Sequence, residues 1–538
     1  NTFVLVILIL IGGVAPIASV FISCLVLWYF TAEEDLGYEP RDEDMRSKHS
    51  FLENLKYDIM VPFKYITTAT FPKIIFIITF SLVLFSVFLM PVDLANGKLK
   101  GGLDFALGIT WQVYFGVVCI FVIIILPFTI FYYESHDPDA SGIKGIFNQA
   151  KWAIIFTIGI LIAAAFVIGL SYIWLGQVEL GYELQVQKDT AFVTTLSAAT
   201  IDSSRNPVAM PTNIYIRLSI VLYAVAIICI FGYLLFATCG GCGLTALPIL
   251  SFRALKYPPK LVTPDAFSSK QQEVMEKSKK LIEIGEKLQE LYDEGKLGPK
   301  HVRMFNQFRT STYQLEHDWK VICKNFRPLS GGKNMVMNIV TFVLRIGYGI
   351  IATLLSIIWI AHVVVALAIE PIPNVGWSWG GLSILFNYID YASGPFPVGG
   401  PILYGVFVLH QLICVIAGNA LVASRLPLIA VHPLIPHDTM LSSLLFNAGV
   451  FLLASVSVNQ FAVTAFSQYV SNSVLDTIFG SAIRNLYILK YVMVALVYIY
   501  LVSAVLGLLI SIIMFFCGGK PQDKAELDDT LRNLGIDG

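Results

Sequence analysis

The chain has 538 residues, of which 56% are hydrophobic and 14% charged, and its mean hydropathy is +0.72. Soluble domains are about half apolar and about a quarter charged, so this composition excludes an ordinary soluble protein. The net charge of −1 gives no overall field that would attract nucleic acid, and we expect no nucleic-acid partner. The apolar residues are concentrated in blocks of about twenty or more with almost no charge, which is typical of helices in a lipid bilayer.

These blocks predict an all-α fold, a polytopic membrane helix bundle with about nine transmembrane helices. In chain order the spans are 3–30, 71–92, 107–133, 150–175, 213–238, 335–369, 402–424, 441–465 and 486–516. Each is long enough to cross ~30 Å of hydrocarbon at ~1.5 Å per residue. The first block exceeds the signal-peptide core of about 7–15 residues, and we interpret it as an anchor.

The predicted organisation has four parts. Helices one to five occupy 1–238, a soluble insertion occupies 239–334, helices six to nine occupy 335–516, and a tail occupies 517–538. Most Lys and Arg fall in the loops on the side that includes the insertion and the tail. The positive-inside rule therefore predicts a cytosolic insertion and C-terminus, and an N-terminus that is outside or lumenal.

The loop after the first span contains an amphipathic segment at 49–66. Phe51, Leu55 and Ile59 recur in it at helical spacing. We interpret this segment as an interfacial helix lying on the cytosolic leaflet. A helix packed against the insertion explains the pattern equally well.

The insertion predicts a cytosolic helical hairpin over 265–327. Val274, Leu281 and Leu288 follow at intervals of seven residues on a charged helix, as in a short coiled coil. The run Gly295–Pro299 forms the predicted turn, and the return helix carries an apolar stripe. Two interpretations stay open: a soluble cap, or a docking site for a protein partner.

The predicted outer loop at 370–401 has no Lys or Arg and is rich in aromatic and turn-forming residues. Trp377 and Trp379 fit an interfacial aromatic belt. A re-entrant segment is the alternative, because irregular backbone is tolerated at membrane depth where protein buries it.

The sequence contains none of the common enzyme motifs: no Walker A loop, HExxH, G-x-S-x-G or G-x-G-x-x-G. We therefore expect no enzyme, no catalytic residue and no cofactor. Cys239 and Cys242 form a CxxC pair, which we place at the cytosolic end of the fifth span. Half of a zinc site and a redox pair lack the required sequence context, so we expect no metal site. Acylation and a small-residue kink stay open.

Polar residues inside the spans indicate where function lies, because each needs a partner in lipid. His362 and His410 are each predicted to lie ~10–12 Å below the outer surface. Asn459 and Gln460 lie in the outer half of the eighth span, and Arg345 lies about ten residues into the sixth. Together these residues predict a ligand-binding cavity that opens outward between spans six to eight. The alternatives are separate interhelical hydrogen bonds and, for Arg345, snorkelling to the interface.

Two acidic residues, Asp93 and Glu134, close apolar runs. By position they are span-end anchors that pair with basic loop residues. The runs that contain them also carry a family resemblance, together with two later segments. These segments are Met90-Pro91-Val92-Asp93, Leu126-Pro127-Phe128 with Phe131-Tyr132-Tyr133-Glu134, the glycine-rich turn before Leu247-Pro248, and Trp319, Cys323 and Phe326-Arg327-Pro328-Leu329.

In these segments and in its nine-span layout the chain resembles the limb-region-type (LMBR-like) membrane protein family. That family includes the lipocalin-interacting membrane receptors and the lysosomal cobalamin transporter-like proteins. The resemblance implies a transporter or uptake receptor for a small vitamin-like or lipophilic ligand, in an endolysosomal or plasma membrane. A non-transporting scaffold or signalling receptor, working through the cytosolic hairpin, is the alternative.

Overall fold

The structure is a computed structural model. It describes residues 2–31, 71–135, 143–186, 208–256, 264–293, 333–369, 380–394, 398–422 and 439–516, with Phe308, Ser311, Thr312, Leu315, Trp319 and Leu434. The chain divides into two compact units. The first unit comprises Asn1–Leu247 and Ala352–Leu509, and the second comprises Pro248–Ile351 and Ile510–Gly538.

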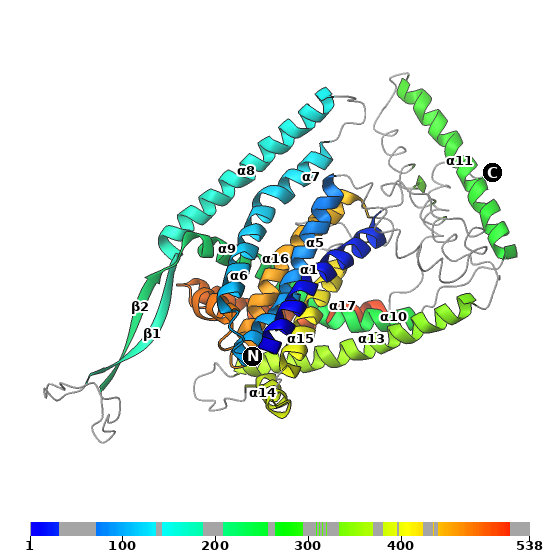
Figure 1. Ribbon diagram of the computed structural model, residues 1–538. Helices are drawn as coiled ribbons and strands as arrows, with labels where there is room; N and C mark the ends of the chain where they lie inside the picture. Colours follow the sequence, from blue (N-terminus) through cyan, green and yellow to red (C-terminus); the bar gives the residue numbers. More distant parts are fainter. Residues whose placement is uncertain are drawn as a thin grey trace. The chain divides into compact units, whose positions relative to one another are not determined.

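Nine helices in the described part of the chain are long and apolar enough to cross a membrane, which confirms the predicted helix bundle. They run in chain order through both units (Figure 1). The helices are α1 (Thr2–Phe30), α5 (Phe71–Leu99), α6 (Asp104–Ile120) continuing into α7 (Leu126–Glu134), α8 (Ile143–Leu175), α9 (Ile220–Leu235) continuing into α10 (Gly241–Lys256), α13 (Lys333–Val363), α15 (Gly399–Val422), α16 (Leu441–Ala465) and α17 (Leu489–Phe516).

Within the described residues, four π-helical segments lie in or beside these helices: η1 (Phe121–Ile125), η2 (Phe236–Gly240), η3 (Val364–Ile369) and η4 (Asp476–Ile483). Single π-turns of this kind are frequent at functional sites. The segment η1 comes just before Pro127, which has no N–H to donate to the helix ladder. The segment η2 contains Cys239.

The fifth span differs from its predicted bounds of 213–238. Residues up to Arg217 belong to a strand, and the helix begins at Ile220, where the Ser219 hydroxyl accepts a hydrogen bond from the N–H of Leu222. The helix then continues to Lys256, so Cys239 and Cys242 lie inside it and not at its end. Its glycines do not break the helix, because they serve close packing against other helices.

Two strands between α8 and α9 form an antiparallel hairpin that we did not predict. Strand β1 (Gln177–Val186) pairs with β2 (Val208–Arg217), with Gln177 opposite Arg217. Figure 1 shows the pair continuing from the end of α8. The alternation of Val178, Glu179 and Leu180 is the strand pattern that could have revealed it.

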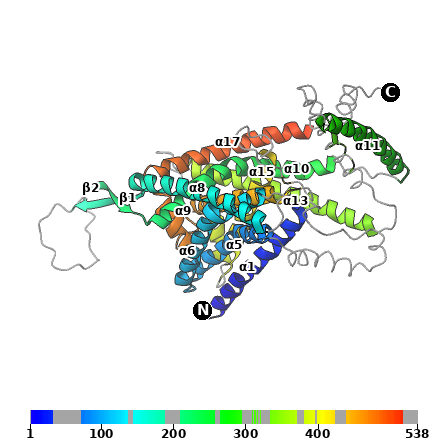
Figure 2. The same ribbon diagram turned by 90° about the horizontal axis from the view of Figure 1, so that it is seen from above.

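Helix α16 is the most buried span of the first unit and packs against α5, α9 and α15. Glycines permit its close contacts and those of its neighbours. A Cβ at Gly232 would meet the backbone of Leu453, one at Gly418 would meet the carbonyl oxygen of Cys239, and one at Gly243 would meet that of Cys414. The resulting core runs the length of α16. Figure 2 shows the neighbouring helices α5, α9 and α15 from above.

In the second unit, α11 (Pro264–Asp293) buries Leu281 and Ile284 together with Leu315. The ring of Phe267 contacts that of Trp319, and Gly285, later in α11, lies beside the ring of Phe308. The later residue of α11 thus faces the earlier residue of the return segment, as in an antiparallel pair. The predicted turn at 295–299 and the predicted interfacial helix at 49–66 lie outside the described residues, and the complete helical hairpin stays a prediction.

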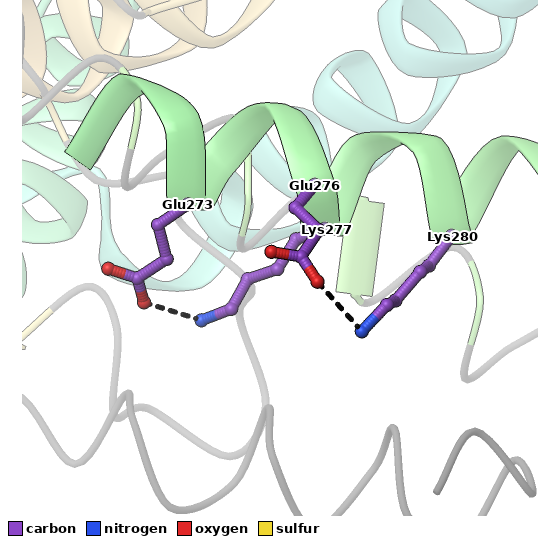
Figure 3. Close-up of polar contacts among 4 residues, drawn as sticks. All are labelled: Glu273, Glu276, Lys277 and Lys280. Carbon is purple, nitrogen blue, oxygen red and sulfur yellow. Dashed lines mark hydrogen bonds and ion pairs between the residues drawn. The ribbon is translucent and has the colours of Figure 1, made fainter. Parts of the chain in front are cut away.

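Beside this buried stripe, α11 carries ion pairs one helical turn apart (Figure 3). Lys277 Nζ lies 3.1 Å from Glu273 Oε1, and Lys280 Nζ lies 3.3 Å from Glu276 Oε1. Such solvated pairs contribute about 0.3–0.5 kcal/mol each to helix stability, so they indicate a water-facing surface more than a functional site.

Candidate functional site: a polar seam in the helix bundle

The first unit has one end at which α8 meets β1, and we call it the hairpin end. The sequence predicts that this end is the outer or lumenal one. Several side chains of α13, α15, α16 and α17 place polar atoms inside the apolar core near this end. We call them the polar seam: Ser356, Trp359, His362, His410, Gln411, Asn459, Gln460 and Tyr500.

His362 is buried and connects α13 to the short helix α14 (Leu382–Ala392), which occupies part of the predicted outer loop. Its Nδ1 accepts a hydrogen bond from the N–H of Leu382 at 3.2 Å, so Nε2 carries the proton. The imidazole also stacks on Phe466, with ring centroids 4.4 Å apart. Gly381 has φ +51° and a Cβ there would meet the imidazole, so the sharp turn before α14 fits only glycine.

His410 is buried on α15 at a different level of the bundle. Its Nε2 lies 3.1 Å from Ser356 Oγ and 3.6 Å from Cys414 Sγ. The Trp359 ring, one turn of α13 beyond Ser356, packs against His362 at a centroid distance of 5.9 Å. Each histidine therefore has its own protein partner, and an aromatic ring lies between the two levels.

A chain of hydrogen bonds crosses the seam. Trp359 Nε1 donates to the Tyr500 hydroxyl at 3.0 Å, and that hydroxyl donates to Gln411 Oε1 at 2.6 Å. Gln411 Nε2 is buried and has no partner among the described residues. We did not predict these three residues as site residues, although Gln411 adjoins His410 in the sequence.

Two of the three side-chain amides of α16, those of Asn459 and Gln460, are satisfied poorly or not at all. Gln460 Nε2 donates to Met493 Sδ at 3.3 Å, and its Oε1 lies 3.9 Å from Cys229 Sγ. Sulfur is a weak hydrogen-bonding partner. Asn459 is fully buried, and neither its Oδ1 nor its Nδ2 has a partner in the described part of the chain. An unsatisfied buried polar group costs about 1–3 kcal/mol of stability, so Asn459 should lower the free energy of unfolding.

Arg345, the fifth predicted site residue, is exposed on α13. It belongs to the second unit, whereas His362, His410, Asn459 and Gln460 belong to the first. The structure therefore brings together four of the five predicted residues within one unit.

A second polar network closes the hairpin end. The buried Asp93 carboxylate accepts hydrogen bonds from the backbone N–H groups of Val474 at 3.2 Å and Leu475 at 3.0 Å. The expectation that Asp93 pairs with a basic loop residue was therefore wrong, because the start of η4 supplies N–H donors that favour a negative charge. Close by, Gly97 leaves no room for a Cβ against the Asn472 carbonyl oxygen, 2.7 Å away.

The same network includes α14. The Tyr469 hydroxyl donates to Asp390 Oδ2 at 2.7 Å, and the N–H of Gly400 donates to Asp390 Oδ1 at 2.8 Å. Burial, and then the adjacent Asp390 carboxylate, raise the pKa of Tyr469, so its hydroxyl stays protonated as a donor. Lys98 Nζ lies 4.3 Å above the Tyr469 ring and donates to Asn387 Oδ1 at 2.7 Å.

The CxxC pair lies in a tightly packed part of the core. Cys239 and Cys242 are free, buried thiols, and Cys242 Sγ lies 3.3 Å from the carbonyl oxygen of Ser503. A Cβ at Gly241 would lie 2.5 Å from the carbonyl oxygen of Tyr500. No three His, Cys, Asp or Glu side chains gather as metal ligands within the described ranges. This geometry favours the small-residue interpretation of the motif.

Comparison with known proteins shows the family. The model of the LMBR1-like membrane protein family matches residues 14–328. A LIMR family protein of Dictyostelium discoideum is 30% identical over 491 residues, which cover 85% of this chain and 92% of that protein. LIMR family proteins of Oryza sativa subsp. japonica and Arabidopsis thaliana are 26% and 25% identical, each over 79% of this chain and 85% of the relative.

No solved structure matches the chain. The family match covers the segments that carry the sequence resemblance, from Met90-Pro91-Val92-Asp93 to Phe326-Arg327-Pro328, and confirms it. The Asp93 carboxylate that anchors η4 belongs to the first of these segments. With its nine membrane-spanning candidates among the described residues, the chain belongs to the LMBR1-like membrane protein family.

Proposed function

We propose that the protein is a transporter or uptake receptor for a small lipophilic or vitamin-like molecule, and that the polar seam is its ligand-binding site. The observation that carries this proposal is Asn459, whose two amide atoms are buried without partners among the described residues. Buried polar groups are almost always hydrogen-bonded, and one that is not requires an explanation. A ligand with a polar group would supply the missing hydrogen bonds.

The rest of the seam supports a ligand of mixed character. Gln411 Nε2 is a second donor without a partner in the described part of the chain. Aromatic rings lie near Gln411, because its partner Tyr500 accepts a hydrogen bond from Trp359. The centroid of the Trp359 ring lies 5.9 Å from that of Phe407 and 5.9 Å from that of Phe461. Ligand sites of this kind are mostly apolar and contain a few placed polar groups that fix orientation. We further propose that the ligand enters from the hairpin end and that this end faces the outside or the lumen of an endolysosomal or plasma membrane.

Reconstitution tests this proposal. The full chain is placed in liposomes, and the uptake of radiolabelled retinol and cobalamin is measured against protein-free liposomes. We expect uptake of at least one ligand, reduced about tenfold by His410→Gln, because one lost hydrogen bond of about 1.4 kcal/mol changes an equilibrium tenfold. Thr110→Ala on α6, which lies outside the polar seam, is the control and should leave uptake unchanged. Equal uptake by wild type and protein-free liposomes for both ligands contradicts the proposal.

The second unit supports a second candidate function, docking of a signalling partner. On α11, Met275 and Ile282 are 49% and 58% exposed and are seven residues apart, so they share a helix face. Two exposed apolar residues at this spacing suit a partner helix. The double variant Met275→Glu and Ile282→Glu should abolish a cellular phenotype without lowering reconstituted uptake. Unchanged phenotype with the double variant argues against docking on this face.

A further inference from the structure

The base of the β-hairpin, residues 177–180 and 213–217, is fixed firmly to the helix bundle. The N–H of Tyr487 donates to the carbonyl oxygen of Gln177 at 2.8 Å, and the N–H of Glu179 donates to that of Asn485 at 2.9 Å. Lys490 Nζ lies 2.6 Å from Glu179 Oε2. Residues 485–487 thus extend the two strands at their base. The base therefore has a defined position relative to the helix ends of its own unit.

The two faces of the base differ in polarity. Residues opposite each other in an antiparallel pair share a face. Val178 opposite Ile216 and Leu180 opposite Ile214 make one face apolar. Glu179, Asn213 and Tyr215 lie on the other face, where Asn213 Nδ2 donates to Glu179 Oε1 at 2.7 Å.

Only half of the apolar face is covered by the protein. Val178 is buried in the core, whereas Ile214 and Ile216 are 45% and 52% exposed. The flanking helix ends expose similar residues. At the end of α8, Trp174 is 77% exposed, and at the start of α9, Val221 is 62% exposed. Helix α8 buries only 11% of its most apolar window inside the protein, so it faces lipid along most of its length.

We propose that the base of the hairpin lies in the interfacial region of the bilayer at the hairpin end, with Ile214 and Ile216 in contact with lipid acyl chains. The apolar face is continuous with the exposed apolar residues at the end of α8 and the start of α9, and both helices are long and apolar enough to cross a bilayer. Trp174 and Tyr172 are residues of the aromatic belt. The Arg217 guanidinium lies 5.6 Å above the Tyr172 ring, at the position where it can bind a lipid phosphate.

This placement gives the hairpin a second role beside linking α8 to α9. A strand pair alone is marginally stable in water. Lipid acyl chains cover Ile214 and Ile216, which the helix bundle leaves exposed. Asn213 and Tyr215, on the opposite face, remain in water.

The test is the depth of single labels in the full chain reconstituted in phosphatidylcholine vesicles. Ile214→Cys and Ile216→Cys are each labelled with bimane, and Asn213→Cys, on the opposite face, is the matched control. The labelled parent protein gives the background of native cysteines. Doxyl-labelled lipid should quench the first two labels about threefold more than the control, as for apolar residues of an interfacial element. Aqueous iodide should quench the control more.

Two results overturn the proposal. Equal iodide quenching at 213, 214 and 216 places the whole base in water. Protection of 214 and 216 from both quenchers shows that a protein surface, such as a second copy of the chain, covers the apolar face. The control is closely matched, because Asn213 and Ile214 are adjacent in the strand and their side chains point to opposite faces.

Discussion

The two halves of α16 each bury an asparagine, but they differ in whether its amide has hydrogen-bond partners. Toward its start, Asn447 Oδ1 accepts from Asn419 Nδ2 at 2.6 Å, and Asn447 Nδ2 donates to the Ser443 carbonyl oxygen at 2.8 Å. Toward the hairpin end, Asn459 is equally buried but has no partner among the described residues. The first half therefore holds helices together, whereas the second buries an amide without a partner among the described residues, which we propose serves a ligand.

The backbone packing follows the same division. Near Asn419, Gly418 lies so close to Cys239 that no Cβ fits. Near Asn459, the side-chain amide of Gln460 has, among the described residues, only the sulfur atoms of Cys229 and Met493 as hydrogen-bond partners. Three predictions test this difference and a fourth tests the base of the hairpin, from the largest expected effect to the smallest.

The substitution Gly418→Leu should abolish folding. Its side chain would meet the Cys239 carbonyl oxygen, and overpacking of backbone against backbone costs about 3 kcal/mol or more. Size-exclusion chromatography in detergent measures the loss of monodisperse protein. Gly116→Leu on α6, where nothing lies within 4 Å of a Cβ, is the matched control and should fold. Normal folding of both variants would show that the first half is not closely packed.

The substitution Asn447→Leu should lower stability by about 1–3 kcal/mol, because it leaves the Asn419 amide buried and unsatisfied. Thermal unfolding monitored by fluorescence gives the change in Tm. The double variant Asn419→Leu and Asn447→Leu should recover part of the loss, since both polar groups are then gone. A double variant less stable than the sum of the single ones contradicts the pairing.

The substitution Asn459→Leu should raise stability by about 1 kcal/mol, because it replaces an unsatisfied amide with an apolar side chain of similar size. The same thermal unfolding assay therefore gives opposite signs for the two asparagines of one helix. A fall in Tm comparable with that of Asn447→Leu would mean that Asn459 has a structural partner.

The substitution Glu179→Gln should have the smallest effect, about 0.2–1 kcal/mol, since the pair with Lys490 is partly exposed, with side-chain exposures of 28% and 15% for Lys490 and Glu179. Raising the salt concentration should remove most of the difference in Tm between wild type and variant. A loss that persists at high salt would indicate that Glu179 acts through packing and not through charge.

The sequence predicts the spans well, because a bilayer imposes length and apolar composition on each helix independently of tertiary contacts. The predicted bounds of a span are wrong where a polar or turn-rich segment adjoins it in the sequence. The fifth helix begins after β2 and continues past Cys242, since the glycines there serve helix packing, and a window of hydropathy cannot distinguish packing glycines from breaking ones.

The site was harder to predict than the fold. His362 and His410 are buried, but their separate partners, Leu382 and Ser356, come from contacts that no single span reveals. Asn447 and Asn459 have the same local sequence character, a polar amide in an apolar helix. Only the packing of α15 beside α16 shows that Asn447 has a partner and that Asn459 has none among the described residues, so the structure was needed to distinguish them.

Uptake by Asn459→Leu in proteoliposomes tests the central claim most directly. Wild type and variant are reconstituted at equal protein density, and Tm and ligand uptake are measured on the same preparation. We predict that the variant is at least as stable as wild type and that its uptake falls about tenfold, as for the loss of one buried hydrogen bond to a ligand. Unchanged uptake in a stable Asn459→Leu variant would contradict a ligand site in the polar seam.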